Sequence, residues 1–115
     1  MGLDNYALPS QDGDLSREDI QAFVQSGVRL GGLEGSFRGK LYYEFIEEIT
    51  GVNLYQDWIP PVTIKKMYQA LVKYDPKKAV AKDYCSDPIT ESQILELQTF
   101  FKICSERNLG LRSSY

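Results

Sequence analysis

Six lysine side chains lie between residues 65 and 82 and form the largest concentration of one charge in this 115-residue chain. Residues 51–82 hold 6 basic and 2 acidic side chains, whereas residues 1–50 hold 4 basic and 9 acidic ones, and the whole chain has a net charge of −3. Ammonium groups bind phosphates or the carboxylates of a protein partner. The segment therefore predicts either a docking surface for an anionic partner or the solvated side of an amphipathic helix.

A helical wheel places Lys66, Gln69 and Lys73 opposite an apolar stripe, with Lys65 at its flank. This distribution is typical of a solvated helix face. The segment contains no arginine, the side chain that most often reads bases, and the rest of the chain is acidic. The candidate surface for an anionic partner or for nucleic acid is Lys65, Lys66, Gln69, Lys73, Lys77 and Lys78.

The chain contains no histidine, which removes the most frequent general base and the imidazole metal ligand. The stretch "GGLEGSFRGK" departs from a phosphate-binding loop, because Glu34 and Leu41 occupy positions that need glycine and Ser or Thr. Glu44, Glu47 and Glu48 lack calcium-loop spacing and are read as a solvated face. We therefore expect no catalytic residue, metal site or cofactor, and a protein that is not an enzyme.

Helix-start signals recur at both ends of the chain. Ser16 with Asp19, and Thr90 with Gln93, have the spacing of capping boxes. Two further amphipathic segments span residues 36–51 and 62–74, a short helix is predicted at 76–82, and no stretch alternates like a strand. The predicted fold is an all-α bundle of four main helices plus a possible short fifth helix.

The periodicity also predicts which side chains face the core and where the helices end. Gly39 weakens the first turn of the second helix, and Gly110 is the expected stop of the last one. The predicted core positions of the first three helices are Ile20, Phe23, Val24, Phe37, Leu41, Tyr42, Phe45, Ile46, Ile49, Ile64, Met67, Tyr68, Leu71 and Val72.

The last helix is apolar on two sides. Leu95, Thr99 and Ile103 project away from its main stripe, which contains Ile94, Leu97, Phe101 and Cys104. Such a helix is either packed centrally on both faces or offers one face to another chain. Under the second interpretation Leu95, Thr99 and Ile103 are candidate partner-binding residues.

Eight tyrosines and one tryptophan favour an interaction surface, since aromatic side chains are enriched at interfaces. Tyr43 is expected on the polar side of its helix. Trp58 lies in the connection before the third helix, where it either binds a partner or plugs the core. Both are candidate partner-binding residues.

Residues 1–13 are polar and punctuated by Gly and Pro, so we expect a flexible leader followed by a single helical domain at 14–115. No apolar run predicts a membrane span or a signal peptide, and Cys85 and Cys104 are expected to be reduced thiols, which together predict a cytoplasmic protein. The expected function is that of an acidic interaction module (adaptor, regulator or inhibitor) that binds a protein partner or a second copy. The alternative is a nucleic-acid-binding protein that uses residues 65–82.

Overall fold

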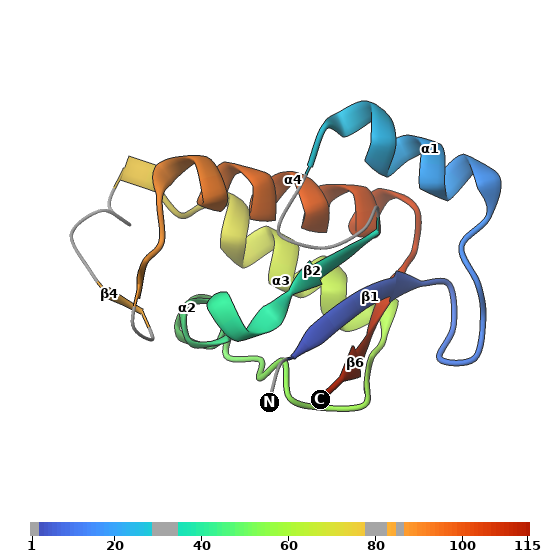
Figure 1. Ribbon diagram of the computed structural model, residues 1–115, viewed down its shortest axis with the longest axis horizontal. Coiled ribbons are helices and arrows are strands. Elements are labelled where there is room, and N and C mark those ends of the chain that lie inside the picture. The colour runs from blue at the N-terminus through green and yellow to red at the C-terminus, as the bar shows by residue number, and fades with distance from the viewer. Residues whose placement is uncertain (1–2, 29–34, 78–82, 85–86) are drawn as a thin grey trace.

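The computed structural model describes residues 3–28, 35–77, 83–84 and 87–115 (Figure 1). Helices and an antiparallel sheet share one hydrophobic core, so the prediction of an all-α helical bundle is wrong. The sheet has the strand order β2-β1-β6-β3, and a separate two-stranded ribbon pairs β4 with β5. The strands are β1 (Asp4–Leu8), β2 (Ser36–Arg38), β3 (Trp58–Ile59), β4 (Asp83–Tyr84), β5 (Asp87–Pro88) and β6 (Gly110–Ser114).

The helices begin where the capping signals predicted. In α1 (Arg17–Ser26) and α4 (Glu91–Glu106), Ser16 and Thr90 form complete capping boxes with the third helical residue. Gly27 ends α1 in the left-handed conformation. The remaining helices are α2 (Tyr43–Thr50), which follows the 3-10 turn η1 (Gly39–Leu41), and α3 (Pro61–Val72).

Strand β1 lies in the segment that was expected to be a flexible leader. It pairs with β2 along one side and with β6 along the other. Its side chains alternate, with Asn5 and Ala7 buried and Asp4 and Tyr6 exposed. Residues 4–8 are therefore an interior strand of the sheet, and the expected boundary at residue 13 does not separate them from the rest of the fold.

The segment before α2 also differs from the prediction, because residues 36–41 form β2 and η1 rather than the first turns of a helix. Gly39 explains the change of direction. A Cβ atom at this position would overlap Oδ1 of Asn5, so only glycine lets the chain pass so close to β1.

The end of α4 is set by Asn108 rather than by Gly110. Asn108 has a φ of 57°, in the left-handed region that Asn tolerates better than most residues. The N–H of Leu109 then donates to the carbonyl of Cys104 at 2.8 Å, and Gly110 begins β6. The predicted helix stop is thus the first residue of a strand.

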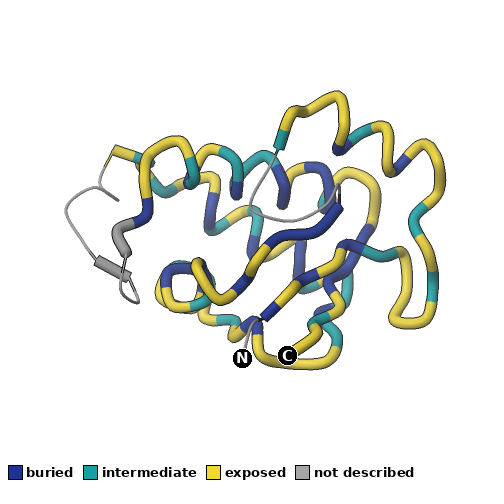
Figure 2. The backbone as a smooth tube through the Cα atoms, in the orientation of Figure 1, coloured by how far each residue is buried: buried dark blue, intermediate teal, exposed yellow. Residues whose placement is uncertain are grey.

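Helices α3 and α4 lie on one side of the sheet (Figure 1). Aromatic side chains of the core pack between α1, α4 and the sheet. Phe100 on α4 is central, with ring centroids 5.0 Å from both Phe23 on α1 and Phe37 on β2. Several predicted core positions are instead exposed, because α1 and α3 each bury only a narrow stripe and because the residues before α2 form η1 rather than a longer helix (Figure 2). These are Ile20, Val24, Leu41 and Val72.

Within the described part of the chain, no helix is long and apolar enough to cross a membrane, and no three His, Cys, Asp or Glu side chains are grouped to hold a metal ion. Cys104 is buried with a free thiol. The carboxylate of Asp75 accepts from the N–H of Lys77 at 3.0 Å, but most of the predicted helix at 76–82 lies outside the described residues, as does Cys85.

Candidate functional site

The face of the sheet opposite α3 and α4 is exposed and carries two aromatic side chains and an arginine in one row. Tyr6 on β1 pairs with Arg112 on β6, and Arg112 pairs with Trp58 on β3. Because side chains alternate along each strand, all three point to the outer face, while their neighbours Ala7, Leu111 and Ile59 are buried. We call Tyr6, Arg112 and Trp58 the sheet row.

Trp58 can occupy this position because Gly110 has no side chain. A Cβ atom at Gly110 would lie 2.7 Å from Cζ2 and 2.8 Å from Cη2 of the indole. The ring therefore lies directly over the start of β6, and Trp58 is half-buried. Sequence reasoning selected Trp58 but missed Tyr6 and Arg112, since the strands that align them were not predicted.

Two surface hollows adjoin the row, and Arg112 lines both of them. One, of about 330 Å³, is lined by Gln11, Asp12, Asp57, Arg112 and Ser113. The other, of about 250 Å³, is lined by Tyr6, Leu8, Gly13, Asp14, Arg112 and Ser114. Among the described residues Arg112 forms no ion pair, so its guanidinium faces solvent between carboxylates.

A second aromatic group lies beyond the C-terminal end of β6. The rings of Tyr43 and Tyr55 are 5.0 Å apart at 85°, and those of Tyr55 and Tyr115 are 5.5 Å apart at 66°. Tyr43 comes from α2, Tyr55 from the loop before β3, and Tyr115 from the residue after β6. We call these three residues the tyrosine cluster; only Tyr43 was selected from the sequence.

A carboxylate accepts a hydrogen bond at each end of the tyrosine cluster. The hydroxyl of Tyr43 donates to Oε1 of Glu44 at 3.1 Å, and that of Tyr115 donates to Oδ1 of Asp57 at 3.3 Å. The negative charge of Asp57 raises the pKa of Tyr115 above its ordinary value. Asp57 also lines one of the hollows, and it therefore links the tyrosine cluster to the sheet row.

The predicted basic surface is present on α3 and just beyond it. Lys65, Lys66, Gln69 and Lys73 are exposed, as is Lys77. Lys78 lies outside the described residues. Because α3 directs Ile64, Met67 and Leu71 into the core, the polar side chains face solvent, as the helical wheel predicted.

The outward side of α4 is not one continuous exposed surface. Leu95 is 49% exposed, but Ile103 is only 9% exposed and belongs to the core. Between them Thr99 is half-buried and its hydroxyl donates to the carbonyl of Leu95 at 3.0 Å. The end of α4 that carries Ile103 packs against α1, which is why the expected stripe is buried there.

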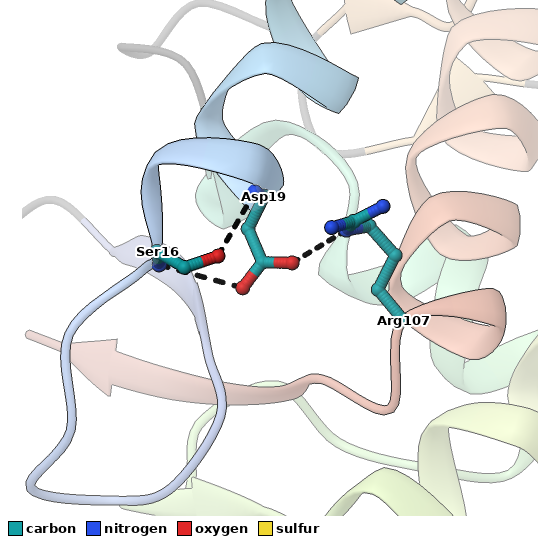
Figure 3. A network of polar contacts seen from close by, with 3 residues as sticks. All are labelled: Ser16, Asp19 and Arg107. Carbon is teal, nitrogen blue, oxygen red and sulfur yellow. Dashed lines mark hydrogen bonds and ion pairs between the residues drawn. The ribbon is translucent and has the colours of Figure 1, made fainter.

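Polar contacts also join α1 to the end of α4 (Figure 3). Asp19 accepts from the backbone N–H of Ser16 and forms an ion pair with Arg107. Burial opposes ionisation of Asp19, but the hydrogen bonds from Arg107 and Ser16 outweigh it and hold its pKa below the ordinary value. Nearby, burial raises the pKa of the Cys104 thiol, which leaves little nucleophilic thiolate.

The geometry of the sheet row and the tyrosine cluster suits binding: exposed rings, a guanidinium and carboxylates come together from segments far apart in the sequence. Comparison with known proteins adds no analogue, since no family model, curated protein or solved structure matches this chain.

Proposed function

We propose that this protein is a small interaction module that acts by binding a protein partner, with the sheet row at the centre of the interface. The observation that carries the proposal is the in-register alignment of Tyr6, Arg112 and Trp58 on an exposed sheet face. Trp, Tyr and Arg are the side chains that most often dominate protein-binding energies, because they combine a large apolar area with a polar group.

The charges around the row favour a protein over a nucleic acid. Asp12, Asp14 and Asp57 line the hollows on either side of Arg112. Carboxylates in this position repel a phosphate backbone, whereas a protein surface offers both signs of charge to match them. The partner is either a different protein or a second copy of this chain, and the module serves as an adaptor, regulator or inhibitor. A cytoplasmic location is part of the proposal, because the free thiol of Cys104 fits a reducing compartment.

The test is affinity capture from an extract of the native host, with and without nuclease, followed by titration of the purified candidate. The double substitution Arg112→Glu, Tyr6→Ser is expected to raise the dissociation constant tenfold or more, because it removes two side chains of the row. Both side chains are exposed, so their loss should leave the core intact. The matched control is Lys66→Glu with Lys73→Glu on α3. Circular dichroism and urea unfolding verify that each variant is folded.

Equal affinity of wild type and the Arg112/Tyr6 variant would refute the role of the row. If no partner is captured, sedimentation of the pure chain decides between a second copy and no interaction. A concentration-dependent dimer that the same variant dissociates supports the proposal, whereas a strict monomer contradicts it.

The alternative function is nucleic-acid binding through α3. Its support is that Lys65, Lys66 and Lys73 are exposed and form no ion pair with the described residues. It predicts capture that nuclease abolishes and an affinity that falls steeply with salt and with the Lys66→Glu, Lys73→Glu pair. Nuclease-resistant capture that the α3 variant leaves unchanged would exclude it.

A further inference from the structure

We propose that the tyrosine cluster binds an arginine side chain of the protein partner. This inference rests on the proposed function, because it assigns the chemistry of the group that the partner presents. It concerns Tyr43, Tyr55 and Tyr115 with the two carboxylates that accept their hydrogen bonds, Glu44 and Asp57.

The rings are open to a ligand at one end of the cluster. Tyr55 is 37% exposed and Tyr115 is 55% exposed, while Tyr43 is half-buried and supports Tyr55 from α2. The rings meet at steep angles of 85° and 66°, so they form walls rather than a flat stack. A planar guanidinium fits against such a wall, where it stacks on one ring while its N–H groups reach the polar atoms at the rim.

The electrostatics of the cluster select a cation. The carboxylates of Glu44 and Asp57 mark its two ends, and both accept from a phenol hydroxyl. That hydrogen bond increases the electron density of the ring, and a cation over the ring face is attracted by its negative quadrupole. Glu47, exposed on α2, adds negative charge on the same helix, and the basic side chain that shares a hollow with Asp57 is Arg112 of the sheet row.

The same features disfavour other ligands. A phosphate would be repelled by the carboxylates, and an apolar side chain would make no use of the negative charge of Asp57 beside Tyr115. Arginine is favoured over lysine because its fork can stack on a ring and still donate to a carboxylate.

The position of Asp57 places this site next to the sheet row. It accepts from Tyr115, its backbone carbonyl accepts from the N–H of Ser113 at 3.3 Å, and it lines a hollow with Arg112. A partner that covers the row is therefore within reach of the tyrosine cluster. One interface would then contain aromatic anchors on the row and a charge-matched arginine beside it.

The first experiment uses the full chain and a capped decapeptide that contains three arginines among Gly and Ser, followed by NMR of the tyrosine ring resonances. We expect the ring signals of Tyr55 and Tyr115 to shift, and Tyr55→Leu and Tyr115→Leu each to weaken binding by about two- to fivefold. Asp57→Asn is expected to weaken it by a similar factor. The peptide with Gln in place of Arg should not shift these signals.

Two matched variants separate this site from general attraction to an acidic protein. Tyr68→Leu removes a half-buried tyrosine of α3 that lies outside both the sheet row and the tyrosine cluster, and Glu106→Gln removes an exposed carboxylate at the end of α4. Both should bind the peptide like wild type. Equal losses in Glu106→Gln and Asp57→Asn, or wild-type affinity in both leucine variants of the cluster, would overturn the inference.

Titration with the captured partner distinguishes this inference from the proposed function. If Arg112→Glu weakens binding of the partner but Tyr55→Leu and Tyr115→Leu do not, the arginine site is refuted and the interaction module stands. If all three weaken it, both are supported. If none does, both are refuted.

Discussion

Asp19 near the start of α1 forms an ion pair with Arg107 at the end of α4, and these residues are 88 positions apart in the sequence. The same carboxylate closes the capping box of α1 by accepting from Ser16. One side chain therefore both starts a helix and holds it against the core. Only the capping part of this arrangement could be inferred from local sequence.

Asp19 makes the stability of the protein depend on pH. Its pKa is lowered in the folded state, so its interactions stabilise the fold above the unfolded-state pKa and are lost as the pH falls through the folded-state value. Asp19→Asn is expected to lower the free energy of unfolding by about 1 kcal/mol at pH 7, a value kept small because Arg107 is partly exposed to solvent. Urea unfolding at pH 7, 5 and 3 measures the difference from wild type, which should shrink as the pH falls.

Glu18→Gln is the matched control for this experiment, because it removes an exposed carboxylate from the same helical turn. We expect its effect to stay within a few tenths of a kcal/mol, as for an exposed charge near a helix N-terminus. A difference between wild type and Asp19→Asn that is the same at pH 7 and pH 3 would contradict the assigned role of Asp19.

Gly110 and Trp58 provide a test of the sheet row that does not require a partner. Gly110→Ala places a methyl group against the indole and against the carbonyl of Ile59, so we expect a loss of about 1–3 kcal/mol in the free energy of unfolding. Trp58 is the only tryptophan, so its emission spectrum reports whether the indole has moved. Ser114→Ala, an exposed change on the same strand, should leave the free energy of unfolding and the emission spectrum unaltered. An unchanged spectrum for Gly110→Ala would show that the indole does not pack tightly on Gly110.

The helix starts were predictable because capping is local chemistry: Ser16 and Thr90 bond to backbone groups three residues away. The strands were not, because their stability comes from distant partners. The alternation of β1 is hidden by a polar residue on its inner face, Asn5, whose amide donates to the hydroxyl of Ser113 on β6. From the sequence alone, Gly110 is as compatible with the end of a helix as with the start of a strand, and only the pairing of β6 with β1 decides between them.

The candidate surfaces were predictable only in part, for the same reason. The lysines of α3 follow from periodicity within one helix, and the structure places them as expected. The sheet row and the tyrosine cluster combine residues from both ends of the chain with residues from α2, β3 and the loop before β3. Tyr43 was predicted from its residue type and its expected place on the polar side of a helix, and Trp58 from its residue type and its place in a connection. No local pattern identifies their neighbours Tyr55, Tyr115 and Tyr6.

Leu95 and Ile103 lie on the same side of α4 by sequence periodicity, yet the structure predicts that mutation of Ile103 costs far more stability than mutation of Leu95. Leu95→Glu should change the free energy of unfolding by less than about 0.5 kcal/mol, because the side chain is half exposed. Ile103→Glu should destabilise the protein by about 3–5 kcal/mol or prevent folding, since it places an unpaired carboxylate in the core that α1 covers. Urea unfolding of each single variant measures this, with Ile103→Val as a control for side-chain loss that costs about 1 kcal/mol. If Ile103→Glu were as stable as wild type, that end of α4 would be a surface, and the packing of α1 against α4 would have to be revised.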